Sequence, residues 1–174
     1  PTTTTITADE SVDIEVKVLD QYGNLVPQQN IQWQNSNGSL STITPSSGWS
    51  EAQRFFAWTA GQQTVNVTWN GISVEVLITV TTGAPSHFEI SPCSENIAAG
   101  EDCQFIFILR DAKMNELQLS EAGSISWQVD DGNMTTAGLY SADKVGTWNV
   151  NLSSASGASA SSVITVGHGL IDHL

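Results

Sequence analysis

Cys93 and Cys103 are the residues whose type and spacing allow the clearest chemistry in this chain. They lie ten positions apart, on either side of the segment SENIAAGED, which the sequence predicts to be a turn. If the two thiols face each other across an antiparallel strand pair, they can form a disulfide that stabilises the fold by about 3 kcal/mol through chain entropy. The alternative is a pair of reduced, half-buried cysteines.

Asparagines followed by X-Ser or X-Thr are candidates for N-glycosylation in a host that exports and glycosylates the chain. Two of them lie at equivalent positions of an internal repeat, between residues expected to face inward, so their side chains are predicted to face outward. Chance matches to a short motif, in a chain rich in Asn, Ser and Thr, are the alternative. The four candidates are Asn37, Asn66, Asn133 and Asn151, of which Asn66 and Asn151 are the equivalent pair.

Trp49 is the candidate for contact with a ligand. It lies in the stretch TPSSGWSEA, where the first half of the chain has nine more residues than the second half. An exposed indole on a Ser/Gly-rich loop can stack on a sugar ring or dock a protein partner. The alternative is that it folds back over the rim of its domain. Trp33, Trp127 and Trp148 are predicted to lie in the core, whereas the sequence does not decide the place of Trp58.

Nothing in the sequence predicts catalysis, a metal site or a cofactor, so we do not expect an enzyme. The nucleophile-elbow motif G-x-S-x-G is missing from the sequence, and the histidines fall at joints between repeats. The acidic pairs Glu101-Asp102 and Asp130-Asp131 lie in predicted turns and are expected to be solvated corners. Calcium held by such acids and backbone carbonyls is the alternative. The three histidines are His87, His168 and His173.

The elements that must position these residues occur twice along the chain. An offset of 91 aligns the start of the chain with its second half, and a period of about 86 to 94 residues continues to the end. Such a period indicates tandem copies of one small domain. Residues Pro1, Ile6, Ala8, Glu10, Asp20 and Asn24 align with Pro92, Ile97, Ala99, Glu101, Asp111 and Asn115.

Strict alternation of apolar and polar residues predicts half-buried β-strands in both copies. Segments rich in Gly, Asn, Asp and Ser separate these strands, which indicates antiparallel β-sandwiches. The segments whose alternate residues are predicted to face inward are 12–18, 65–69 and 72–80 in the first copy, and 103–109, 150–152 and 158–166 in the second.

The order of these motifs resembles the immunoglobulin-like repeats of bacterial and archaeal surface proteins such as invasin and intimin. The D-x-x-G-N turn of that family matches Asp20, Gly23 and Asn24, while the second copy keeps Asp111 and Asn115 and has Met114 in place of the glycine. The resemblance covers nearly the whole chain and implies an all-β fold of two tandem immunoglobulin-like antiparallel β-sandwiches. The family's aromatic-x-A, G and V-x-V pattern matches Phe55, Ala57, Gly61, Val65 and Val67, and then Tyr140, Ala142, Gly146, Val150 and Leu152.

Composition narrows the class of partner. The formal net charge is −13, from 18 acidic and 5 basic side chains, which argues against nucleic acid as a partner. Charged residues make up 13% of the chain, against roughly 25% in average proteins, a profile typical of secreted or cell-surface β proteins. No run of 18 apolar residues occurs, so no membrane insertion is predicted in this segment.

The ends of the chain are out of phase with the repeat. The second copy opens at GAPSHFEIS, before Pro92, whereas the first copy starts at Pro1 and lacks that strand. The segment HGLIDHL overlays residues 82–88, so the expected domains are 1–82, 83–167 and the start of a third repeat at 168–174. A fragment of a longer array of repeats would begin and end within a repeat in this way. The alternative is that the C-terminal segment of one molecule completes the first copy of the next by strand addition.

The resemblance implies a structural role rather than a chemical one. We expect a spacer or stalk segment of a large extracellular or cell-surface protein, whose partners are neighbouring repeats or other copies of itself. The alternative function is a carbohydrate- or protein-binding module of a secreted enzyme or adhesin, whose partner would be a glycan or a surface protein.

Overall fold

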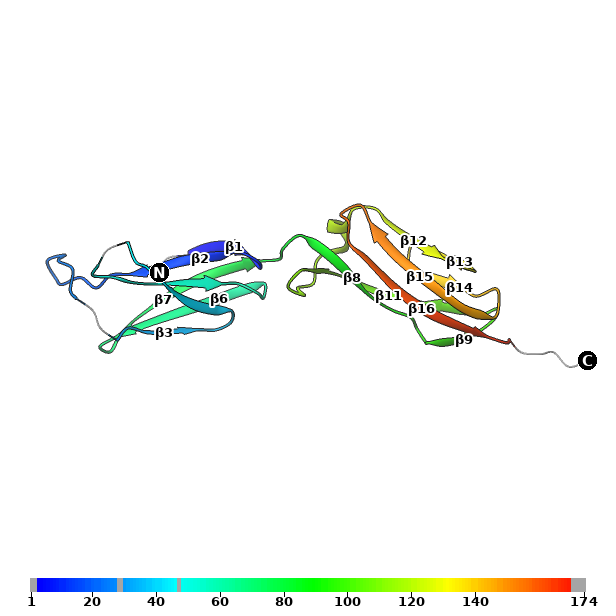
Figure 1. Ribbon diagram of the computed structural model, residues 1–174, viewed down its shortest axis with the longest axis horizontal. Coiled ribbons are helices and arrows are strands. Elements are labelled where there is room, and N and C mark those ends of the chain that lie inside the picture. The colour runs from blue at the N-terminus through cyan, green and yellow to red at the C-terminus, as the bar shows by residue number, and fades with distance from the viewer. Residues whose placement is uncertain (1–2, 28–29, 47, 170–174) are drawn as a thin grey trace, which may run out of the picture. The chain divides into compact units, whose positions relative to one another are not determined.

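The computed structural model describes residues 3–27, 30–46 and 48–169 (Figure 1). The chain divides into two compact units, Pro1–Gly83 and Ala84–Leu174, and each unit consists almost entirely of β-strands. Within the described ranges the single helical element is η1, Leu119–Ala122, one short 3₁₀ turn, and no helix there is long and apolar enough to cross a membrane. The predicted all-β fold is confirmed.

The first unit is a sandwich of two sheets. Its larger sheet has the strand order β1-β7-β6-β3, and its smaller sheet has the order β2-β5-β4. Most neighbours are antiparallel, but β1 runs parallel to β7. The strands are β1 Thr3–Thr7, β2 Ser11–Val16, β3 Gln32–Asn35, β4 Ser39–Ile43, β5 Glu51–Phe56, β6 Gly61–Trp69 and β7 Ile72–Thr81.

One hydrophobic core lies between these two sheets. Phe55 from the smaller sheet packs with Val65 and Ile78 from the larger one, and all three side chains are fully buried. Trp33 packs against this core from β3, as its repeat position predicts. The alternating pattern of the sequence therefore produces the sandwich, because alternate residues of the strands, with the exception of the start of β7, enter the same core.

The second unit has the same plan with additional strands. Its larger sheet has the order β11-β8-β16-β15-β12, with β9 also paired to β16, and its smaller sheet has the order β10-β14-β13. The strands are β8 Pro85–Ser91, β9 Asn96–Ala98, β10 Asp102–Gln104, β11 Ile106–Asp111, β12 Ile125–Val129, β13 Asn133–Met134, β14 Leu139–Ser141, β15 Gly146–Ser154 and β16 Ser159–Gly167.

Two clusters of buried residues form the core of this unit. The first gathers around Phe105 and Tyr140 and corresponds to the core of the first unit. The second gathers around Phe88 and Leu109, beneath β8. Trp127 packs against both clusters, and its ring lies edge-on to Phe105 and Phe107.

The strand β8 is the main difference between the two units. It pairs with β11 on one side and with β16 on the other, and the described part of the first unit contains no strand at the corresponding place. One sequence prediction fails as a result: alternation placed Ile72 and Val74 inward, but these side chains are 64% and 56% exposed. Their equivalents Ala158 and Ala160 lie beneath β8.

The D-x-x-G-N turns adopt one geometry in both units. Oδ1 of Asp20 accepts hydrogen bonds from the backbone N–H groups of Tyr22 and Asn24, both at 2.9 Å. Oδ1 of Asp111 accepts the same pair of bonds from Lys113 and Asn115, at 2.8 and 2.9 Å. The turn requires a left-handed residue at its fourth position, where Gly23 has φ +84° and Met114 has φ +68°.

Candidate functional site

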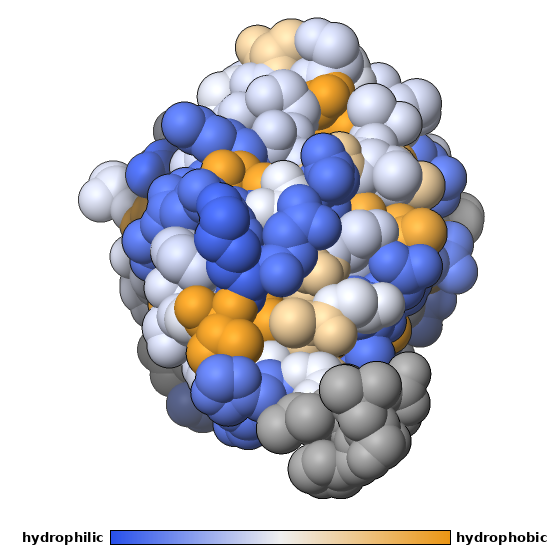
Figure 2. Space-filling view, turned by 90° about the vertical axis from the view of Figure 1, so that its right-hand side faces the viewer, coloured by the Kyte–Doolittle hydropathy of each residue, from blue (hydrophilic) through white to orange (hydrophobic). Residues whose placement is uncertain are grey.

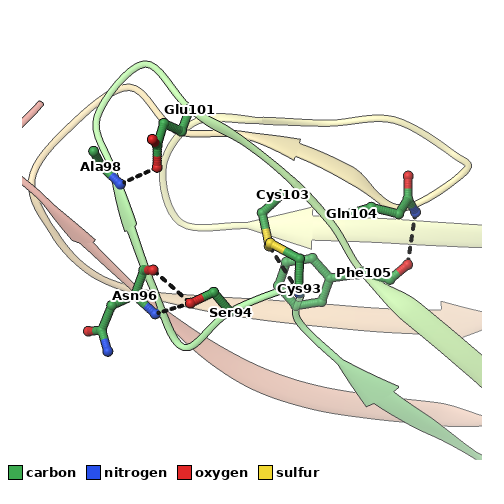
Figure 3. Close-up of a disulfide and its surroundings, with 8 residues drawn as sticks. All are labelled: Cys93, Ser94, Asn96, Ala98, Glu101, Cys103, Gln104 and Phe105. Carbon is green, nitrogen blue, oxygen red and sulfur yellow. Dashed lines mark hydrogen bonds between the residues drawn. A yellow bond between two sulfur atoms is a disulfide. The ribbon is translucent and has the colours of Figure 1, made fainter.

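The two cysteines of the second unit form a disulfide, with their Cα atoms 5.5 Å apart (Figure 3). Cys93 follows β8, and Cys103 lies in β10 with its side chain buried beside Phe105. The pairing matches the sequence prediction, but the enclosed segment is more than a turn, because it contains the strand β9. β9 pairs in parallel with β16, so the disulfide encloses one strand of the larger sheet.

Trp49 is exposed, with 52% of its surface accessible. The segment that carries it is fastened to the sandwich by Glu15 of β2, whose carboxylate accepts hydrogen bonds from Ser46 Oγ at 2.6 and 2.7 Å and from Ser50 Oγ at 2.6 Å. The hydroxyls of Ser46 and Ser50 lower the pKa of Glu15 from 4.5 to about 2. The carboxylate of Glu15 therefore holds both ends of the segment around Trp49, and the indole of Trp49 stays at the surface.

The second unit has no carboxylate at the position of Glu15. The offset of 91 aligns Glu15 with Ile106, whose side chain is 64% exposed. The second unit also lacks the extra residues that carry Trp49. The clamp and the exposed indole are therefore a feature of the first unit.

The remaining tryptophans divide between core and surface. Trp33 and Trp127 pack against the cores, as predicted. Trp148 is half-buried against the second core, and its Nε1–H donates a hydrogen bond of 3.0 Å to the carbonyl of Lys144. Trp58, which the sequence left undecided, is 46% exposed.

The four sequon asparagines have the exposure that a modification site needs. Asn37, Asn133 and Asn151 are exposed, and Asn66 is partly exposed. Asn66 and Asn151 lie in β6 and β15, where the residues on either side of each are buried, so both face away from the cores. Glycosylation at these positions stays a prediction.

The predicted solvated corners do not assemble into one site. Glu101 accepts a hydrogen bond from the backbone N–H of Ala98 within its own turn (Figure 3). Asp130 accepts bonds from Asn149, and Asp131 pairs with Lys144 at 2.8 Å. Across the described ranges, no three His, Cys, Asp or Glu side chains gather closely enough to hold a metal ion.

An apolar groove runs along the first unit, at the place that corresponds to the position of β8 in the second unit. It comprises two adjoining hollows of about 540 and 220 Å³, and Val16, Lys17, Val67 and Val74 line both of them. Val18, Leu19 and Ile72 line the smaller hollow, and Val12 and Val76 line the larger one. The sequence did not predict this groove, because alternation alone predicted Ile72 and Val74 to be buried.

The apolar residues on the face presented in Figure 2 lie in small groups between hydrophilic ones, without one continuous patch. Scattered apolar side chains of this kind are normal on a folded protein. The groove differs from them because its apolar residues form a continuous channel along two strands.

No family model and no curated protein matches this sequence. Solved structures do match its fold. The Escherichia coli adhesin FdeC is 20% identical, covers 95% of this chain and superimposes with a TM-score of 0.51, and the chain spans 60% of the length of that structure. The D00-D0 domain of intimin is 14% identical with a TM-score of 0.52, and the match covers 92% of this chain and 94% of that one. At these identities the likeness shows the fold alone: this chain consists of two tandem immunoglobulin-like β-sandwiches, an arrangement similar to that of these two proteins.

Proposed function

We propose that this chain is a non-catalytic structural or spacer segment of a large extracellular or cell-surface repeat protein, of the stalk, adhesin or surface-layer type. The observation that carries the proposal is that, in each unit, a strand near the start of the unit pairs in parallel with the last strand. In the first unit, β1 pairs with β7 over five residues, from Thr3 opposite Leu77 to Thr7 opposite Thr81. In the second, β9 pairs with β16 over three residues.

Parallel pairing matters because of the direction in which a spacer is loaded. Tension pulls β1 toward its N-terminal end and β7 toward its C-terminal end, so two parallel strands must slide past each other. The hydrogen bonds between them then bear the load together, whereas a strand pulled from one end loses its bonds one at a time. A unit built in this way resists extension along the chain.

Three further features support an extracellular location. The disulfide between Cys93 and Cys103 is typical of oxidising compartments, where such bonds persist. FdeC, whose fold is similar, is described as an adhesin. The composition is acidic, with 18 acidic and 5 basic side chains, which fits the surface of a secreted protein and argues against a nucleic-acid partner.

The joint between the units also fits a spacer. β7 ends at Thr81 and β8 begins at Pro85, so three residues connect the two sandwiches. Pro85 has a fixed φ angle, which removes part of the backbone freedom at this joint. A short connection of this kind adds little slack when the chain is extended.

Single-molecule force spectroscopy tests this function. We expect a high unfolding force for the first unit when the chain is pulled from its two ends. In the matched control, one handle is attached at Asn70→Cys, in the turn between β6 and β7, so that β1 is peeled from β7 instead of sheared. A clearly lower force in the control supports the proposal, and equal forces in the two geometries contradict it.

The same units can assemble by strand addition, in which the segment 168–174 of one molecule completes the first unit of another. This segment was assigned to the start of a third repeat from the sequence, and residues 170–174 lie outside the described ranges. Assembly of this kind would give a head-to-tail filament whose partners are other copies of the chain.

Trp49 favours a second candidate function, a carbohydrate- or protein-binding module of a secreted enzyme or adhesin. Its indole is exposed, and the segment that carries it is held in place by Glu15, so an aromatic surface is presented without a large ordering cost. A glycan affinity screen with the wild-type chain and Trp49→Ala tests this function. Loss of a measured affinity in the variant supports it, and identical profiles argue against it.

A further inference from the structure

The first unit contains two Asn-Gly dipeptides, Asn37-Gly38 between β3 and β4 and Asn70-Gly71 between β6 and β7. Glycine has no side chain to shield its backbone nitrogen, so in such a dipeptide this nitrogen can attack the side-chain carbonyl of the preceding asparagine. Because the two dipeptides have the same chemistry, any difference between their reactivities in the folded chain comes from the geometry that the fold imposes on each.

At Asn37 the two reacting groups already lie together. The backbone N–H of Gly38 donates a hydrogen bond of 2.7 Å to Oδ1 of Asn37. The Gly38 nitrogen is therefore no more than about 3.9 Å from Cγ, the carbon to which Oδ1 is bonded. The side chain of Asn37 is exposed, so water reaches the site. This arrangement is close to the contact that the attack requires.

Asn35 of β3 supports the reaction as a positioning residue. Its Nδ2 donates hydrogen bonds of 3.1 Å to the carbonyl oxygens of both Asn37 and Gly38, which fixes the turn between them. The Asn37 carbonyl belongs to the same peptide group as the Gly38 nitrogen. When that nitrogen loses its proton, negative charge spreads to this oxygen, and a hydrogen bond to the oxygen stabilises the charged form.

At Asn70 the backbone separates the same two groups. Asn70 and Gly71 form the tight turn between the paired residues Trp69 and Ile72, and both are left-handed, with φ values of +49° and +81°. In a left-handed residue Cβ lies close to the residue's own carbonyl oxygen, so the following nitrogen points away from the side chain. The turn must open before Asn70 can react.

We propose that Asn37 is a site of spontaneous deamidation, at which the folded chain modifies itself without an enzyme. The Gly38 nitrogen forms a bond to Cγ of Asn37 while the Cγ–Nδ2 bond breaks, and Nδ2 leaves as ammonia with the proton from the Gly38 N–H. Water then opens the resulting succinimide ring at one of its two carbonyl carbons. Opening at Cγ gives a normal aspartate, and opening at the main-chain carbonyl gives isoaspartate. This inference does not depend on the proposed function.

The second unit demonstrates that a normal aspartate fits this turn. The repeat aligns Asn37 and Gly38 with Asp131 and Gly132, and the two glycines have nearly equal φ values of +87° and +84°. Oδ1 of Asp131 accepts a hydrogen bond of 2.8 Å from Nζ of Lys144. Deamidation therefore gives the first unit the residue type that the second unit already has. It also removes the amide nitrogen to which an N-linked glycan would be attached, so the two modifications exclude each other at Asn37.

Isoaspartate, by contrast, adds one carbon atom to the main chain where the backbone is tightly packed. A Cβ atom on Gly38 would overlap the carbonyl oxygen of Phe56 and lie 2.9 Å from the ring of Phe55, which is fully buried. β4 begins at the next residue, Ser39, opposite Phe56. The extra atom must therefore displace the start of β4 from its partner strand.

Mass spectrometry of the whole chain, aged in mildly alkaline buffer, tests the proposal. Trypsin cleavage after Arg54 places the two asparagines in separate peptides, 18–54 and 55–110. In the folded chain Asn37 should deamidate at least about fivefold faster than Asn70, and in concentrated urea the two rates should converge. The proposal is overturned if Asn70 keeps pace with Asn37 in the folded chain, or if folding protects the amide of Asn37.

Variants at Asn35 test its positioning role. Asn35→Val introduces the residue that the second unit has at the equivalent position, Val129, and Asn35→Asp keeps the shape of the side chain without its N–H donor. Both should slow deamidation of Asn37 in the folded chain by at least about threefold and leave the rate in urea unchanged. Equal rates in the variants and the wild-type chain would show that Asn35 has no such role.

The isoaspartate product is tested by its effect on stability. The aged isoaspartate form, separated by chromatography, should unfold its first unit at a lower denaturant concentration than Asn37→Asp, which carries the same charge without the extra backbone atom. Asn37→Gln should form neither product, because its longer side chain would have to close a larger ring. Equal midpoints for the isoaspartate form and Asn37→Asp would contradict the packing argument.

Discussion

At the scale of single residues, the two copies of the D-x-x-G-N turn differ in the free-energy cost of their backbone conformation. Both turns place a residue at positive φ, but the first unit uses Gly23 and the second uses Met114. A side chain in the left-handed region costs roughly 1–2 kcal/mol, partly offset by the larger unfolded-state entropy of glycine. The side chain of Met114 is 55% exposed, so little packing compensates for this cost.

Met114→Gly should therefore raise the free energy of unfolding of the second unit by about 0.5 to 1 kcal/mol. Chemical denaturation followed by residue-resolved NMR measures this change. Gly23→Met is the reciprocal control and should destabilise the first unit by a similar amount. A neutral or destabilising Met114→Gly would mean that the methionine side chain stabilises the turn.

The clamp around Trp49 predicts a dependence on pH. Hydrogen bonds from the Ser46 and Ser50 hydroxyls lower the pKa of Glu15 to about 2, so ionised Glu15 is favoured in the folded state. The stability that it contributes is fully present above pH 4.5, declines as the pH falls below that value, and is lost as the pH falls through 2.

An NMR titration of the Glu15 carboxyl should give a midpoint near 2, and the indole resonance of Trp49 should change in parallel. The double variant Ser46→Ala and Ser50→Ala should move the midpoint up toward 4.5, and Glu15→Gln should remove the titration altogether. A midpoint near 4.5 in the wild-type chain would mean that the clamp does not form in solution.

At the scale of elements, the disulfide and β9 act together. The bond joins Cys93, two residues beyond the end of β8, to Cys103 of β10, and the segment that it encloses contributes β9 to the larger sheet. Closing a loop of this size removes entropy from the unfolded chain. The disulfide therefore stabilises the fold mainly by lowering the entropy of the unfolded state, and this effect is confined to the second unit.

Replacing both Cys93 and Cys103 by Ala should lower the free energy of unfolding of the second unit by about 3 kcal/mol. The first unit contains no cysteine and provides the internal control, since its unfolding curve should not change. Guanidinium denaturation with probes in each unit measures both effects. Equal destabilisation of the two units would contradict separate cores.

The elements also differ in how well alternation predicted them. The strands that are paired on both sides and packed on one face follow the sequence pattern, as the buried Val65, Val67 and Ile78 demonstrate. Alternation failed at the start of β7, because burial there requires a covering strand that the first unit does not contain in its described part. It also missed β9, which is three residues long and is defined by its pairing with β16.

At the scale of the whole molecule, each unit encloses its own core. The buried clusters described above consist of residues from one unit only, so the two units are expected to unfold independently. Val65 and Val150 are equivalent, fully buried residues that allow a matched test of this independence.

Val65→Ala should destabilise the first unit by about 2 kcal/mol, and Val150→Ala should destabilise the second by a similar amount. Each variant should leave the unfolding transition of the other unit in place, as measured by residue-resolved denaturation. A single transition that moves with either variant would show that the units unfold as one cooperative body.

The sequence by itself determined the repeat, the strand pattern and the disulfide pair. These features are local or periodic, so they can be read from residue types and spacing. The tertiary structure alone decided that Glu15 clamps the segment around Trp49 and that Val16, Val18, Ile72 and Val74 share one groove. Such contacts join residues that are far apart in the chain, and their positions depend on how the two sheets face each other. Alternation specifies the face on which a side chain lies, but only the fold specifies whether another strand covers that face.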